Sequence, residues 1–474
     1  MAPEASTSVF RRMPVGREPH EEEGLKRTIG LWQLTAFGVG ATVGTGIFFV
    51  LTEAAPEAGP AVVISFVIAA VTAGLTALCY AELAGSVPVS GSSYSYAYAT
   101  MGEVVAMGVA ACLLLEYGVS ASAVAVGWSE YLNQLLDNLF GWEIPKALAA
   151  APEAGGVVNL PSMILVAMCA LLLIRGASES ATINAIMVLI KVGVLVMFIA
   201  IAATGWNSDN LAEFAPFGVA GIQAASATIF FSYIGLDAVS TAGDEVKDPE
   251  KTMPRAIIMA LIIVSTLYVL VALTAVAAQP WEDFEGQEAG LAQILENVTG
   301  STWPSTVLAA GAVISIFSIT LVVIYGQTRI LFTMSRDGMI PPVFSKVNPR
   351  TLTPIPNTII VSTVVAIVAG FVPLNWLLDT VSIGTLVAFM TVSAGVIILR
   401  RRAPDLERSF KVPFYPVLPI LSIAACIYVL IGLHWYTYVV FLVWVAIVLI
   451  YYRFYGYRHS RIGRNPPADE EVLP

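Results

Sequence analysis

Three ionisable residues lie deep within long apolar segments of this chain. Glu116 and Lys191 are each about 10 to 12 residues from the nearest segment end, or roughly 15 to 18 Å at 1.5 Å per residue, and Asp237 lies at a similar depth. A charge at the centre of a membrane-spanning helix costs about 2.5 to 3.5 kcal/mol, so each of these residues needs a partner or a purpose. Lysine changes its protonation readily when it is desolvated, which suits the binding and release of a proton. The alternative interpretation is a buried ion pair or triad that holds helices together.

A run of glycines interrupts the first apolar segment, which we place at 31–51. The run reads GVGATVGTG and contains Gly38, Gly40, Gly44 and Gly46. Each glycine in a helix interior costs about 1 kcal/mol relative to alanine, so the run favours a break in the helix. Broken helices within a membrane are tolerated where they line a cavity, and there they present free helix ends to a bound solute. The alternative is that Gly40 and Gly44 form a GxxxG pair on which another helix packs closely.

The sixth apolar segment is also weakened, in the stretch 230-FFSYIGLDAVST-241. Its serines and threonine could bond back to the preceding turn of a continuous helix. However, this segment follows the first one by five segments and starts from the opposite side of the membrane. Two weakened segments in corresponding positions of two inverted halves predict a binding site between them.

The elements that position these residues are membrane-spanning helices. Hydrophobic residues make up 57% of the 474-residue chain and charged residues only 12%, which excludes a soluble domain. We therefore expect an all-α integral membrane protein with twelve transmembrane helices. The segments are 31–51, 61–84, 104–133, 161–174, 181–204, 220–243, 256–279, 304–334, 355–372, 376–399, 414–432 and 435–456.

The positive charges predict the orientation. All of the 24 Lys and Arg residues except Lys146 and Lys191 fall on one side if both termini are cytoplasmic. We therefore expect a multi-pass protein of the cell membrane with a disordered cytosolic tail at 1–27 and a second tail at 457–474.

The four cysteines lie within spans and predict no disulfide, and the three histidines lack metal-ligand spacing. We expect no cofactor and no nucleic-acid partner. Four acids closer to span ends, where solvation is available, are expected to be surface or gate residues: Glu82, Asp244, Glu245 and Asp379.

Four stretches together resemble a known family. They are 38-GVGATVGTGIF-48, 88-PVSGSSYSYAYATMGE-103, 235-GLDAVSTAGDEVKDPEKTMPRAI-257 and 325-YGQTRILFTMSRDGMIPPVFSKVNPRTLTPIPNT-358. Their order, spacing and topological side resemble the cationic amino acid transporter family, bacterial type, of the amino acid-polyamine-organocation (APC) superfamily. The last two spans match in hydropathy alone.

The resemblance implies a 5+5 inverted-repeat fold with broken first and sixth helices. The core would occupy 28–402, with repeat one at 28–204 and repeat two at 216–402, and two additional spans would follow at 403–456. Backbone N–H groups would hold the substrate carboxylate; these belong to Val43, Gly44, Thr45 and Gly46. Carbonyls at the broken ends would meet its ammonium group; these belong to Gly40, Ala41, Thr42, Phe230, Phe231, Ser232 and Ile234. Phe231 would also be an apolar lid, although a core aromatic is an equally good interpretation.

The same resemblance implies that the ammonium of Lys191 occupies the place of a coupling ion. It would be linked by hydrogen bonds to Thr45, Glu116 and Asp237. In the eighth span, Val323 lies at the position that selects substrate side chains, between Val322 and Ile324. Aliphatic bulk there favours neutral or small substrates over arginine.

We therefore expect a secondary active transporter that moves amino acids by alternating access, with proton symport. An exchanger or a facilitative uniporter, including one for cationic amino acids or polyamines, remains an alternative. A channel would need a continuous polar lining, and an enzyme would need a nucleophile with its base or a metal site; the sequence shows neither. The sequence is compatible with a monomer and with a complex that contains a small membrane subunit.

Overall fold

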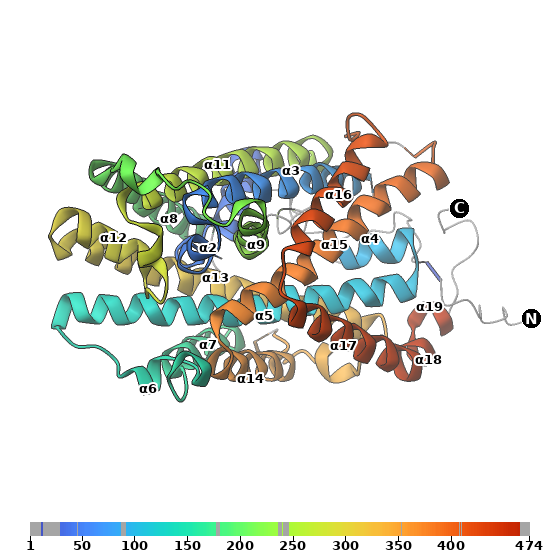
Figure 1. Ribbon diagram of the computed structural model, residues 1–474. Coiled ribbons are helices and arrows are strands. Elements are labelled where there is room, and N and C mark those ends of the chain that lie inside the picture. The colour runs from blue at the N-terminus through green and yellow to red at the C-terminus, as the bar shows by residue number, and fades with distance from the viewer. Residues whose placement is uncertain are drawn as a thin grey trace, which may run out of the picture.

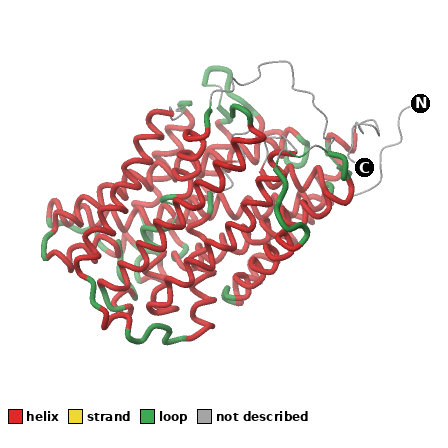
Figure 2. Tube along the Cα trace, turned by 90° about the horizontal axis from the view of Figure 1, so that it is seen from above, coloured by secondary structure: helices red, strands yellow, loops and turns green. Residues whose placement is uncertain are grey.

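The protein is all-helical in the residues that the computed structural model describes. These are residues 11–12, 29–44, 46–86, 92–176, 181–235, 239, 246–351, 353–406, 408 and 410–464. Within these ranges the only strand-like pairing is an isolated bridge between Ile29 and Val246. Figure 2 shows the helices running alongside one another, with loops gathered at the ends of the bundle.

Most of the longer helices follow the apolar segments of the sequence, whereas two, at 92–100 and 290–299, lie between those segments. In the first half they are α1 (Leu31–Thr42), α2 (Val50–Ala58), α3 (Val62–Ser86), α4 (Ser92–Thr100), α5 (Glu103–Phe140), α7 (Leu160–Ile174), α8 (Ala181–Ala202) and α9 (Gly218–Phe230). In the second half they are α11 (Pro249–Ala278), α12 (Gly290–Thr299), α13 (Thr302–Arg336), α14 (Ile355–Phe371), α15 (Leu374–Arg402), α16 (Val417–Ile431) and α17 (Trp435–Tyr451). Three short helices are α6 (Lys146–Ala149), α18 (Tyr457–His459) and α19 (Arg461–Arg464).

Seven of the described helical stretches are long and apolar enough to cross a membrane. Three shorter apolar helices, α7, α14 and α16, accompany them. The chain is therefore a multi-pass membrane protein. The first expected span is divided into α1 and α2, and its second part continues to Ala58, beyond the expected end at Leu51.

The helices pack so that α1 contacts α8 and α11, while α2 contacts α9. Helix α13 contacts both α5 and α8, and α5 also contacts α15. In Figure 1, α6 and α12 lie at one end of the bundle, and α4, α18 and α19 lie at the other.

The described beginning and end of the chain meet at the end that contains α19. The guanidinium of Arg11 lies over the ring of Tyr457 at 4.5 Å, and the carbonyl of Arg11 accepts a hydrogen bond from the N–H of Glu103. Residues near the two termini therefore lie on the same side of the bundle.

Candidate substrate and ion site at two helix ends

Helix α1 ends inside the glycine run. Val43 has an extended backbone (ψ 116°), and Gly44 has φ +116°, a conformation that side-chain-bearing residues rarely adopt. The next α-helix, α2, begins at Val50. Thr45, an expected ligand, lies outside the described residues.

Helix α9 ends in a similar way. A 3-10 turn, Phe231–Tyr233, follows Phe230; Ile234 is extended (ψ 145°), and Gly235 has φ +92°. Residues 236–238, which include Asp237, lie outside the described residues, as do Asp244 and Glu245. The position of Asp237 in the expected hydrogen-bond network therefore stays a prediction.

The two helix ends are in direct contact. A Cβ added at Gly235 would lie 2.5 Å from the carbonyl oxygen of Ala41, and a Cβ added at Gly46 would lie 2.4 Å from Oγ of Ser232. Neither position has room for a side chain. The glycines thus allow two segments almost 200 residues apart in sequence to approach at backbone distance.

Side chains from neighbouring helices satisfy carbonyls around the break. Nζ of Lys191 on α8 donates to the carbonyl oxygen of Gly40 at 2.9 Å, and the hydroxyl of Tyr268 on α11 donates to that of Thr42 at 2.9 Å. The hydroxyl of Tyr131 on α5 donates to the carbonyl oxygen of Phe48 at 2.6 Å. Because a helix end leaves carbonyls without helical partners, these contacts stabilise the interruption.

Lys191 is 2% exposed, and its ammonium therefore depends on protein groups rather than on bulk water. A cavity of about 10 Å³ lies beside it, lined by Phe37, Gly40, Ala41, Lys191, Ser318, Ile319 and Val322. That volume matches about one water molecule, and an amino acid would need the surrounding elements to separate.

Helix α13 provides the apolar wall nearest the break. Ile319 Cγ2 and the carbonyl oxygen of Ser315 each lie 3.8 Å from the place where a Cβ on Gly44 would be. Val323 is also buried, one helical turn further along than Ile319. Sequence reasoning singled out Val323 and missed Ile319, although the i, i+4 spacing places both on one face of the helix.

Of the other expected residues, Phe230, Phe231, Ser232 and Ile234 are buried at the end of α9. The ring of Phe231 contacts that of Phe49 with centroids 6.0 Å apart.

Glu116 is 1% exposed on α5, whereas Lys191 is on α8; both of these helices pack against α13. Sequence reasoning missed Tyr131 and Tyr268, which carry no motif that would distinguish them from core aromatics.

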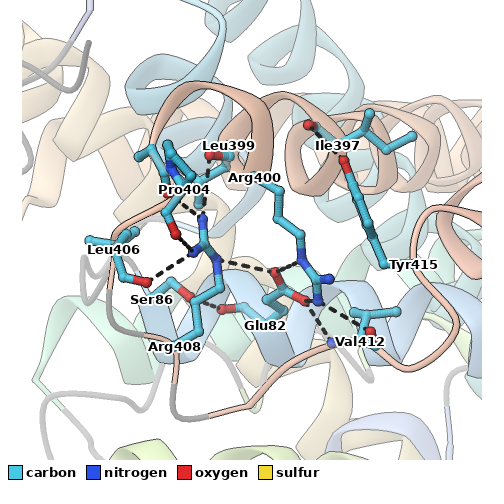
Figure 3. Close-up of polar contacts among 11 residues, drawn as sticks. Glu82, Ser86, Ile397, Leu399, Arg400, Pro404, Leu406, Arg408, Val412 and Tyr415 are labelled. Atoms are coloured by element: carbon cyan, nitrogen blue, oxygen red, sulfur yellow. Dashed lines mark hydrogen bonds and ion pairs between the residues drawn. The ribbon is translucent and has the colours of Figure 1, made fainter.

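Two acids that we expected at the solvated surface are buried. Asp379 is 3% exposed and Glu82 is 1% exposed. Figure 3 shows the carboxylate of Glu82, on α3, between the guanidinium groups of Arg400 and Arg408. Arg400 donates from Nε (2.7 Å) and Nη2 (2.5 Å), and the N–H of Val412 donates at 2.6 Å. The expectation of solvation was wrong because position near a span end does not reveal that Arg400, Arg408 and the N–H of Val412 surround the carboxylate of Glu82.

A larger cavity, of about 330 Å³, lies between the C-terminal part of α5 and the segments 143–149 and 286–293. Its acidic lining includes Glu130, Asp137, Glu143 and Glu288, and Lys146 lies among them. Burial raises the pKa of Glu288, and the nearby Lys146 opposes that rise. None of its lining residues belongs to the helix ends described above.

Comparison with known proteins gives a consistent result. A family model for amino acid permeases matches residues 29–454. The chain is 42% identical to the branched-chain amino acid permease BcaP of Bacillus subtilis (strain 168), over 96% of this chain and 99% of that protein. It is 39% identical to the methylthioribose transporter of the same organism, over 97% and 100%. It is 36% identical to the vacuolar cationic amino acid transporter 4 of Arabidopsis thaliana, over 82% of this chain and 65% of that protein. The chain therefore belongs to the amino acid permease family.

Proposed function

We propose that this chain is a proton-coupled symporter that carries small aliphatic amino acids across the cell membrane by alternating access. The observation that carries the proposal is the hydrogen bond from Nζ of Lys191 to the carbonyl of Gly40 at the end of α1. A buried ammonium that binds a helix end can exchange a proton at the same place where a solute would bind.

The substrate head group would bind between the two helix ends. N–H groups from Gly44 to Gly46 would hold its carboxylate, and carbonyls at the ends of α1 and α9 would hold its ammonium. The N–H of Val43, which we also expected to bind the carboxylate, instead donates to the carbonyl oxygen of Val39 at 2.8 Å. In the structure, Lys191 already occupies one of those carbonyls, that of Gly40. The charged ammonium would fix the end of α1 in the shape that binds the head group and leave the other carbonyls to the substrate. Protonation of Lys191 and substrate binding would therefore favour each other, as symport requires. Glu116, Asp237 and Thr45 would complete the proton-coupling network.

The substrate side chain would lie against an apolar surface. Phe231, Ile319 and Val323 offer no charge to pair with an arginine or lysine side chain. The permease of Bacillus subtilis, which is named for branched-chain amino acids, supports the same choice. The methylthioribose transporter makes a thioether sugar the second candidate, which the substrate panel described below includes.

For the architecture we propose twelve spans in a 5+5 inverted repeat. Repeat one would occupy 28–204 and repeat two 216–402, the two additional spans would occupy 403–456, and both termini would be cytoplasmic. The contact of Arg11 with Tyr457 supports the placement of both termini on one side. A small membrane subunit is not needed for this mechanism.

The experiment is uptake by proteoliposomes of labelled leucine, valine, alanine, arginine and methylthioribose, with and without an imposed proton gradient. We expect the aliphatic amino acids to accumulate when the gradient is inward, without sodium. Uptake that does not exceed equilibrium under the gradient would identify a uniporter or an exchanger instead. Accumulation of arginine in preference to leucine would contradict the assigned side-chain surface.

A thermal-shift titration tests the head-group site separately. Leucine should stabilise the protein, whereas isoamylamine, which lacks the carboxylate, should not, because the N–H groups of the break would lose their partner. Equal stabilisation by both compounds would show that the carboxylate site is misplaced.

A further inference from the structure

A histidine and a buried carboxylate form a pair at the end of the bundle opposite to the Glu82 cluster. His434 is the N-cap residue of α17, and Asp379 lies near the start of α15. Nδ1 of His434 lies 2.8 Å from Oδ2 of Asp379. The imidazole side chain is 53% exposed and the carboxylate side chain only 4%. The imidazole thus connects water with a carboxylate that water does not reach.

The surrounding groups hold the imidazole in one orientation. The hydroxyls of Tyr436 and Thr437 also approach Oδ2 of Asp379, each at 3.4 Å. The ring of His434 stacks on Tyr436, with centroids 5.3 Å apart, and Tyr436 stacks on Trp376 at 5.0 Å. Because Nδ1 faces a carboxylate, it carries a hydrogen, and Nε2 is the atom that takes up a further proton.

The charges around this pair are unbalanced. Glu53 and Glu57 on α2 both interact electrostatically with Asp379. His434 also interacts electrostatically with Glu57. Helix α9 contributes only the hydroxyl of Thr228, which donates to Oε2 of Glu57 at 3.2 Å. The nearby groups on α17 are the phenols of Tyr436 and Tyr438. The 3-10 turn Trp281–Phe284 packs on α2 and carries the exposed Glu282 and Asp283. Glu130 of α5 interacts electrostatically with Glu53.

This arrangement links a titratable surface group to the helices that flank the candidate site. Helix α2 begins directly after the glycine run, and it packs on α9. The carboxylates of Glu53 and Glu57 on α2 therefore lie near enough to Asp379 on α15 to interact with its charge, and His434 is the cation that can balance them. Like charges repel one another unless a proton or a cation intervenes.

We propose that His434 and Asp379 form a proton-binding site at the outer face of the protein, which holds α9, together with the α2 that packs on it, against α15 when the imidazole is charged. With a neutral imidazole, the carboxylates of Glu53, Glu57 and Asp379 oppose that closure. The proposal rests on the transport function above for its readout, but it does not require that a proton gradient drives transport. It concerns a different group from Lys191.

The test measures counterflow exchange of leucine in proteoliposomes at equal pH inside and outside, from about pH 5.5 to about pH 8, where histidine changes its charge. Each exchange cycle requires the outer face to close, so a charged imidazole should make exchange faster. We therefore expect wild-type exchange to be several-fold faster at the acid end. His434→Gln should lose most of this acceleration at the acid end. His434→Arg keeps a planar donor with a permanent charge, so it should show the fast, acid rate at every pH.

The matched control is His459→Gln. His459 also lies against a tyrosine ring, that of Tyr455, but at the opposite end of the C-terminal helices. It should keep the wild-type profile. A wild-type profile in both His434 variants, or an equal loss of pH dependence in His459→Gln, would overturn the proposal.

Failure of the transport proposal would be recognised separately. If a gradient does not drive accumulation, but exchange depends on pH and His434→Gln removes that dependence, then the coupling mechanism is wrong and the outer site stands. If wild-type exchange is independent of pH while the gradient drives uptake, the outer site is wrong and the coupling stands.

Discussion

Gly46 on one helix end lies directly against Ser232 on the other, with 2.4 Å between Oγ of Ser232 and the place where a Cβ would be. This contact brings together the two segments between which we place the substrate. Substrate binding at this place therefore depends on small residues at a few positions, and each position can be tested individually.

Gly46→Ala should impair transport and lower the thermal midpoint, because its methyl group would overlap Ser232 and lie 2.9 Å from the ring of Phe231. We expect a cost of about 1 to 3 kcal/mol, measured as a shift of the unfolding transition in detergent. The control is Gly193→Ala on α8, where nothing lies within 4 Å of the added methyl group. An equal effect at both positions would contradict the tight contact.

Glu82→Gln should destabilise the protein by about 3 to 5 kcal/mol, because it leaves two arginines beside a group that no longer balances their charge. Thermal unfolding measures this loss, and Glu153→Gln in an exposed loop is the control. A shift no larger than that of the control would mean that the cluster in Figure 3 contributes little to folding.

Asp337 should give stability an unusual dependence on pH. Burial raises its pKa above the ordinary value, although the hydroxyl of Tyr94 donates to it at 3.0 Å, and Arg461 and Arg336 oppose the rise. The folded state therefore binds more protons than the unfolded state above about pH 4, and the contribution of this group to stability falls as the pH rises. The thermal midpoint of wild type minus that of Asp337→Asn should decrease from about pH 4 to about pH 7. An increase over that range would show that the ion pairs with arginine dominate, and Asp209→Asn in an exposed loop should show no such trend.

Ile319→Ala should change which substrates are accepted, because it opens space beside Gly44 without removing a head-group contact. Competition assays with amino acids of increasing side-chain size should show a shift toward larger ones, and Val323→Ser should weaken the preference for aliphatic ones. The Ile359→Ala variant on α14, where the side chain is 50% exposed, is the control. An unchanged order of preference in both pocket variants would place the side-chain pocket elsewhere.

Much of the framework could be predicted from the sequence because apolar segment length, glycine clustering and buried charge are local signals. Such signals predict that the chain is a membrane protein, that its first span is interrupted near Gly44 and that Lys191 is buried. Other features depend instead on which helices become neighbours. These are the contact of Lys191 with Gly40, the burial of Glu82 and Asp379, and the roles of Tyr131 and Tyr268. Hydropathy does not encode that information. Thr45 and Asp237 lie outside the described residues, so their roles remain predictions.

Lys191→Gln separates the proton on Lys191 from the transport that we propose it drives. Glutamine keeps an N–H donor for the carbonyl of Gly40 but cannot titrate, so the variant should still exchange leucine while it loses accumulation under an inward proton gradient. Lys251→Gln, at an exposed position, should behave as wild type. If Lys191→Gln accumulates leucine to the wild-type level under the gradient, Lys191 does not couple the proton to transport.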